Sequence, residues 1–187
     1  MAVNSFMVPL GTLAPPFALP CLDGRIVTSD GLAPARPLLV MFLSNHCPYV
    51  RHIERELGSL VAEYTPDVAA VAICSNDVEN YPDDGPAGLT EQAQRAGFTF
   101  PYLLDDTQRV ALAYRAACTP DFFLYDSGRR LAYRGEFDDA RPRNDAPVTG
   151  KALRAALDLV LVGKPAPEPQ VPSMGCGIKW KPGNEPF

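Results

Sequence analysis

The stretch from Pro37 to Tyr64 reads PLLVMFLSNHCPYVRHIERELGSLVAEY. Residues 37–43 are continuously apolar, which is typical of a parallel strand covered on both faces. Apolar side chains then recur at helical spacing from Pro48 to Tyr64. A second apolar run follows at Val68–Ser75. Together these segments predict a β-α-β unit, and its crossover should be right-handed.

Turn residues on both sides of this unit predict two β-hairpins. Asp23-Gly24 interrupts the apolar segment from Phe17 to Val27, and Ser127-Gly128 separates two further strand-like runs. The remaining elements are expected as helices at 90–96 and 108–116, a short strand at 100–105, strands at 121–126 and 130–134, and a last amphipathic helix ended by Gly163. This order predicts an α/β sandwich whose central mixed sheet has four or five strands and helices on both faces.

Length and composition favour one globular domain over residues 1–187, with a core from about 11 to 163. The tail at 164–187 is rich in proline, so we expect it to run extended. The net charge of −5 and the short apolar runs argue against a nucleic-acid or membrane partner. The first residues lack the basic start of a secretory signal, so a cytoplasmic location is expected.

Five cysteines are spread through the chain without any C-x-x-C pair, and there are only two histidines. A zinc site or a disulfide-stapled scaffold is therefore not expected, and neither is a cofactor. In a reducing compartment such cysteines are either buried small hydrophobes or redox-active thiols. The five are Cys21, Cys47, Cys74, Cys118 and Cys176.

Cys47 is the best candidate nucleophile. Pro48 suits the first turn of a helix, which places Cys47 at the helix N-terminus. Unpaired backbone N–H groups and the helix dipole favour a thiolate there. His46 could shuttle a proton, and Ser44 or Tyr49 could donate a hydrogen bond to the sulfur.

Taken with Thr119-Pro120, these motifs resemble the thioredoxin-fold redoxins. That group holds peroxiredoxins of the alkyl hydroperoxide reductase/thiol-specific antioxidant type and thiol:disulfide interchange proteins. The resemblance runs from about Gly11 to Gly163. It rests on the start at Ala14–Phe17, the NHCPYV turn at 45–50 and the Thr119-Pro120 loop. The resemblance implies that Pro120 is a cis-proline beside the active cysteine. The GCGIKWKPGNEP tail at 175–186 also looks like one peroxiredoxin-like branch.

The resemblance implies a second thiol that resolves a mixed disulfide. Many members of the branch carry a cysteine where this chain has Ser44, so a more distant partner is needed here. Cys118 leads because it lies two residues before Pro120, and Cys176 on the tail is the alternative. Peroxiredoxins also use an arginine near the later strand, where this chain has Thr119-Pro120. Arg115 and Arg134 are alternative sources of that charge.

Three functions remain open. The first is thiol:disulfide exchange through Cys47, with Cys118 or an external thiol as resolver. The second is a thiol-dependent peroxidase that forms a sulfenic acid on Cys47. The third is a binding module without catalysis. The partners implied are protein or small-molecule thiols and disulfides, a thioredoxin-type reductant or hydroperoxides, and a homodimer is left open.

Overall fold

The computed structural model describes residues 2–32 and 34–186. Its helices are α1 (Pro48–Tyr64), α2 (Pro86–Ala96), α3 (Arg109–Tyr114), α4 (Lys151–Leu161) and the short 3-10 helix η1 (Pro82–Asp84). Its strands are β1 (Ala2–Asn4), β2 (Ala18–Pro20), β3 (Ile26–Thr28), β4 (Leu38–Phe42), β5 (Ala69–Cys74), β6 (Tyr102–Leu104), β7 (Cys118–Thr119), β8 (Asp121–Tyr125), β9 (Leu131–Gly135) and β10 (Met174–Gly177).

The central sheet has five strands in the order β6-β5-β4-β8-β9. β4 pairs in parallel with β5 and antiparallel with β8, which confirms the predicted mixed sheet. The β4-α1-β5 segment is the β-α-β unit expected from the sequence, and α1 has the predicted bounds. Both predicted hairpins are present, one as β2-β3 and the other as β8-β9.

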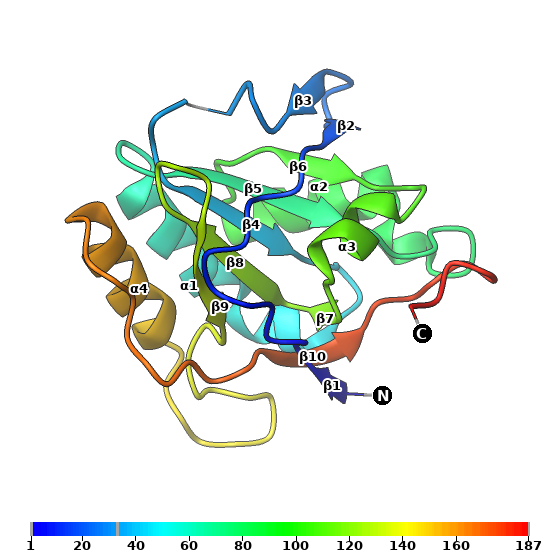
Figure 1. Ribbon diagram of the computed structural model, residues 1–187. Helices are drawn as coiled ribbons and strands as arrows, with labels where there is room; N and C mark the ends of the chain where they lie inside the picture. Colours follow the sequence, from blue (N-terminus) through cyan, green and yellow to red (C-terminus); the bar gives the residue numbers. More distant parts are fainter. Residues whose placement is uncertain (1, 33, 187) are drawn as a thin grey trace.

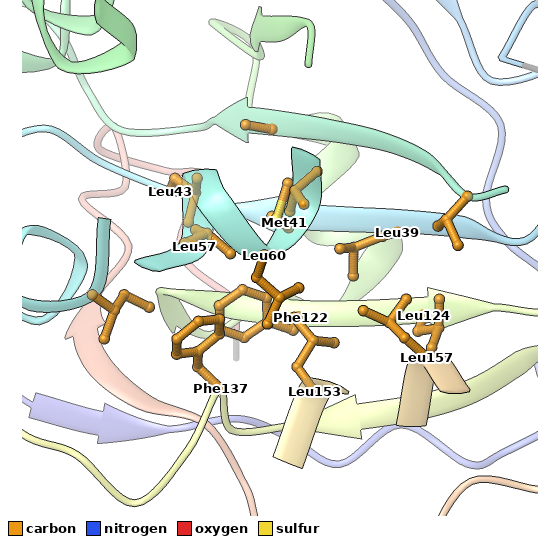
Figure 2. Packing of buried hydrophobic residues seen from close by; sticks show 14 of the residues in the cluster. Leu39, Met41, Leu43, Leu57, Leu60, Phe122, Leu124, Phe137, Leu153 and Leu157 are labelled. Atoms are coloured by element: carbon orange, nitrogen blue, oxygen red, sulfur yellow. The ribbon is translucent and has the colours of Figure 1, made fainter. Parts of the chain in front are cut away.

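The two faces of the central sheet bury different side chains, because successive residues of a strand point to opposite sides. On one face Leu39 and Met41 pack against residues of α1 and α4, including Leu57 and Leu153. Figure 2 shows these leucines meeting Phe122 between the sheet and the two helices. Each fully buried leucine of this kind stabilises the fold by roughly 2 kcal/mol.

The opposite face is covered mainly by α3 and by the N-terminal segment. Val40 and Phe42 of β4 lie on this side with Tyr114 of α3 and Phe17. Helices therefore cover both faces of the sheet, as expected (Figure 1). α2 begins at Pro86, earlier than the expected residue 90, because Pro86 takes the first helical position and needs no hydrogen-bonded N–H.

The tail forms a strand that the sequence did not predict. β10 lies between β1 and β7 in a small three-stranded antiparallel sheet. Figure 1 shows this red strand beside the blue strand β1, and β10 also contacts α1. The Thr119-Pro120 peptide that leads from β7 into β8 is cis, as expected, and Glu168-Pro169 is also cis.

Candidate redox site

Cys47 occupies the N-cap of α1. Its backbone is extended (φ −75°, ψ 119°), and Pro48 follows at the first helical position. The helix therefore presents its unpaired N–H groups to the Cys47 side chain. Cys47 is 0% exposed, and in its protonated form its Sγ donates a hydrogen bond to the Thr119 carbonyl oxygen at 3.0 Å.

The surroundings of Cys47 stabilise its thiolate. Its pKa is lowered to about 6, and the largest cause is a hydrogen bond from the Cys176 thiol. Burial acts in the opposite direction, whereas the Thr119 side chain and the backbone amides of Val50 and Cys176 lower the pKa further. Donors to a charged sulfur favour the charged form, so Cys47 is the ionised thiol of this site at neutral pH.

Cys176 reaches Cys47 because β10 pairs with β7. Cys176 stands directly opposite Thr119 in this ladder and opposite Ala2 in the ladder with β1. Its side chain is half-buried against the core cluster that contains Cys47. The Cys47 hydrogen bond raises the pKa of the Cys176 thiol, and burial and the charge of Cys47 add to this shift, while Lys179 opposes it. The two sulfurs therefore form a thiolate–thiol pair.

Cys118, the leading partner in the sequence analysis, does not make this contact. It is 0% exposed, and its Sγ donates to the Pro120 carbonyl oxygen at 3.4 Å. Burial is the largest cause that raises the pKa of its thiol, followed by the charge of Asp121. The described thiols are all free, so a Cys47–Cys118 disulfide stays a prediction.

Asp84 organises the turn before Cys47, and sequence analysis did not find it. This buried carboxylate accepts hydrogen bonds from the Ser44 hydroxyl at 3.0 Å and the Asn45 backbone N–H at 2.7 Å. Asn76 Nδ2 also donates to it at 2.7 Å. Burial raises the pKa of the Asp84 carboxyl, but the His46 and Asn76 hydrogen bonds outweigh it and the net shift is downward. Asp84 ends the short helix η1, in a segment whose sequence has no periodic pattern, so only the tertiary structure shows its role.

His46 is held by Asp84 and by an aromatic ring. Its Nδ1 lies 2.5 Å from Asp84 Oδ2, and its ring stacks on Tyr81 with 5.1 Å between centroids. These contacts fix the imidazole at the rim of the site. Two further residues expected to support Cys47, Pro48 and Tyr49, line a surface pocket that also includes Cys176.

The remaining sequence candidates lie elsewhere. Arg134 Nη1 donates to Gln170 Oε1 at 2.7 Å, and Arg115 lines a separate pocket that also includes Trp180. Burial raises the pKa of Cys74, and Cys21 packs at the edge of the opposite core cluster. Because Arg134 binds Gln170 and Arg115 lines another pocket, neither arginine supplies a charge to Cys47.

The described residues contain no group of three or more side chains suited to hold a metal ion. None of the helices described is both long and apolar enough to cross a membrane.

Comparisons with known proteins agree with this architecture. A model of the AhpC/TSA family matches residues 10–134. An uncharacterised conserved protein from Geobacillus kaustophilus is 51% identical, with 97% of each chain covered and a TM-score of 0.94. A hypothetical protein from Sinorhizobium meliloti is 48% identical, with 96% of this chain and 99% of that chain covered and a TM-score of 0.94.

A more distant structure shares the fold. A thiol:disulfide interchange protein of the thioredoxin family from Chlorobium tepidum is 16% identical, with 82% of this chain and 99% of that chain covered and a TM-score of 0.62. The search of curated proteins found no match. The predicted thioredoxin-like fold is confirmed by these likenesses.

Proposed function

Because this chain belongs to the AhpC/TSA family, we propose that it is a thiol-based oxidoreductase in which Cys47 and Cys176 form the redox pair. The observation that carries the proposal is that β10 packs Cys176 against the core cluster of the buried Cys47, directly opposite the Thr119 that Cys47 contacts. This proximity lowers the pKa of Cys47 and raises that of Cys176. One thiolate beside one protonated thiol is the arrangement that thiol:disulfide exchange requires.

The overall reaction transfers two electrons. The reduced protein gives both to a disulfide R–S–S–R, whose S–S bond breaks to release two R–SH molecules. A new S–S bond forms between Cys47 and Cys176. The proton of Cys176 leaves with one product thiol, and water supplies the proton of the other. The reaction is reversible, and its direction is set by the reduction potentials of the two couples.

The stabilised Cys47 thiolate favours the reduced protein. A disulfide whose reduced form is stabilised is a stronger oxidant. The pair should therefore accept electrons from ordinary thiols more readily than a structural disulfide does. This property fits a redox role better than a role in holding the tail in place.

Disulfide mapping and single-turnover chemistry test the proposal. Mild oxidation should give one intramolecular disulfide, and peptide mass mapping should find it between Cys47 and Cys176. Reduced protein mixed with hydroxyethyl disulfide should release two molecules of 2-mercaptoethanol per chain. Cys118→Ser should do the same, whereas Cys176→Ser should release at most one, because no second thiol is left to resolve a mixed disulfide on the buried Cys47.

The two alternative functions, a peroxidase and a binding module, predict different results for the parent and its cysteine variants. Rapid consumption of hydrogen peroxide with a sulfenic acid trapped on Cys47 would favour a peroxidase. If Cys47→Ser exchanges thiols as fast as the parent, the chain is a binding module on this fold. Turnover that depends on Cys118 rather than Cys176 would overturn the assigned pair.

A further inference from the structure

A pocket of about 390 Å³ opens beside Cys176. The residues that line it are Ala2, Pro48, Tyr49, Pro142, Arg143 and Cys176. Cys47 is absent from this lining and is 0% exposed. A molecule in this pocket therefore meets Cys176 and not Cys47.

The backbone keeps Cys47 closed. β10 is paired on one side with β1 and on the other with β7, so it covers the Cys47 thiol from the Thr119 side. β10 packs closely against β7 at Gly175, because a Cβ added there would lie 2.0 Å from the Thr119 carbonyl oxygen. Direct access to Cys47 would require two rows of hydrogen bonds to break.

The pocket also carries a positive charge. Arg143 is exposed, and across residues 2–32 and 34–186 it makes no ion pair or hydrogen bond. Lys179 is close enough to oppose the upward pKa shift of Cys176. No aspartate or glutamate stands among the lining residues. A guanidinium without a partner is suited to bind a carboxylate, because its donors match the two oxygens.

Building on the proposed function, we propose that electrons enter this protein through Cys176, from a small thiol whose carboxylate pairs with Arg143 in this pocket. The thiolate attacks Sγ of Cys176 in the oxidised protein. The Cys47–Cys176 bond breaks, Cys47 leaves as a thiolate, and a mixed disulfide remains on Cys176. A second thiolate attacks the outer sulfur of that mixed disulfide, releases R–S–S–R and leaves Cys176, which takes a proton from water.

The chemistry of the two sulfurs supports attack at Cys176. In disulfide exchange the sulfur with the lower thiol pKa is the better leaving group. Here that sulfur is Cys47, whose thiolate is stabilised by its neighbours. Access and leaving-group ability therefore select the same sulfur for attack.

The reduction rates of the oxidised protein test this inference. The probes are 3-mercaptopropionate, neutral 2-mercaptoethanol and cationic cysteamine, each compared at equal thiolate concentration. We expect 3-mercaptopropionate to react about fivefold faster than 2-mercaptoethanol, the effect of one partly exposed charge pair. Arg143→Gln should abolish this preference without changing the 2-mercaptoethanol rate, and Arg143→Lys should keep part of it. Arg55→Gln removes an exposed charge on α1, outside the pocket, so its rates with the three thiols should match those of the parent.

The site of attack is read from the intermediate. Quenching the reaction early with acid, then unfolding the protein and alkylating its free thiols with N-ethylmaleimide, should leave the small thiol on the Cys176 peptide and the maleimide on Cys47. An adduct on Cys47, or equal preference for all three thiols, overturns the inference while leaving the redox pair intact. If oxidation forms no Cys47–Cys176 disulfide, the proposed function itself fails and the inference fails with it.

Discussion

Cys118 and Cys176 lie on adjacent strands of the same small sheet, yet only one of them meets Cys47. In the β7–β10 ladder Cys176 is opposite Thr119, and Cys118 is opposite Gly177. Neighbouring residues of a strand point to opposite sides, and directly opposed residues point to the same side. Cys176 therefore faces the N-terminus of α1 with Thr119, while Cys118 faces away. A register of one residue decides which cysteine can act as partner.

The electrostatic surroundings of the two thiols differ as well. Cys118 lies near the buried carboxyl of Asp121, whose charge raises the pKa of the thiol. The pKa of the Cys176 thiol is also raised, chiefly by its contact with Cys47, but this half-buried thiol lies near Lys179, whose charge acts in the opposite direction. A thiol that must ionise during exchange is better placed beside a cation than beside an anion. The comparison supports Cys176, rather than Cys118, as the proposed partner of Cys47.

The largest effect is expected when β10 is forced away from β7. Gly175→Ala places a Cβ against the Thr119 carbonyl, a backbone atom that cannot rotate aside. The strand must shift, and Cys47 should become open to solvent. Alkylation of Cys47 by iodoacetamide should then be at least about tenfold faster, since reactivity depends on exposure as well as on the pKa. Timed peptide mass analysis near pH 9, where Cys47 is ionised in both proteins, measures the rate.

Gly128→Ala is the matched control for that experiment. Its added Cβ meets only the flexible Asp126 side chain, at 3.3 Å. The alkylation rates of Cys47 and Cys118 should stay at the parent values. If Gly175→Ala also leaves Cys47 unreactive, β10 is not what closes the site.

Local patterns were sufficient for the central part of the fold. The apolar run before Cys47, the helical spacing after it and Pro48 together predicted β4, α1 and the place of Cys47 at the N-terminus of α1. These features depend on residues close together in the chain, so their signal is visible without the tertiary structure. The hairpins at Asp23-Gly24 and Ser127-Gly128 were predictable for the same reason.

The tail and its consequences were not predictable in this way. β10 reads Met-Gly-Cys-Gly, which has no alternation of apolar and polar side chains. It is a strand because β1 and β7, from distant parts of the chain, supply its hydrogen bonds. Cys118 looked favourable through its nearness to Pro120, but the direction of its side chain depends on the strand register. Asp84 likewise gains its role only when η1 meets the turn at Ser44.

The buried carboxyl near Cys118 should make stability depend on pH. Burial raises the pKa of Asp121 to about 7 from its usual 3.8, despite hydrogen bonds from the Ala117 backbone and the Ser5 hydroxyl. A raised acid pKa stabilises the fold fully below the unfolded pKa, and this stability is lost as the pH rises through about 7. The contribution of Asp121 should therefore fall by about 2–3 kcal/mol between about pH 5 and about pH 8.

Asp121→Asn isolates this effect. Urea unfolding of the reduced parent and variant should show that the variant gains stability relative to the parent as the pH rises. Taking the difference between the two proteins removes the opposing contribution of Cys47, whose lowered pKa stabilises the reduced fold above about pH 6. Asp145→Asn, at an exposed position, should show no such trend. A constant difference across the pH range would mean that Asp121 is ionised throughout.

The pKa of Cys47 tests directly which of the two cysteines contacts it. Removing the Cys176 donor by Cys176→Ala should raise the pKa of Cys47 from about 6. A hydrogen bond to a charged group contributes about 1.5–3 kcal/mol, which corresponds to an increase of about one to two pH units. Ultraviolet absorbance of the thiolate, with the Cys47→Ser protein as blank, gives the titration. Cys118→Ala should leave the pKa unchanged, and a larger shift in that variant would reverse the assignment of the two cysteines.

The smallest effect should come from the cation beside Cys176. Lys179 Nζ donates to the Gly177 carbonyl oxygen at 2.9 Å and lies 5.7 Å from the centre of the Tyr81 ring. Its charge lowers the pKa of Cys176, so Lys179→Gln should make that thiol harder to ionise.

Attack of Cys176 on a disulfide should then slow by about two- to threefold, the effect of one partly exposed charge. The rate is measured as release of the first 2-mercaptoethanol when the folded, reduced protein is mixed with hydroxyethyl disulfide, the step in which the accessible Cys176 thiol must ionise. Lys179→Arg should preserve the rate, because it keeps the charge. Lys181→Gln provides the control, since Lys181 pairs instead with Asp106 at 2.6 Å. Equal rates in Lys179→Gln and Lys181→Gln would show that proximity to Cys47, and not the local cation, is what distinguishes Cys176 from Cys118.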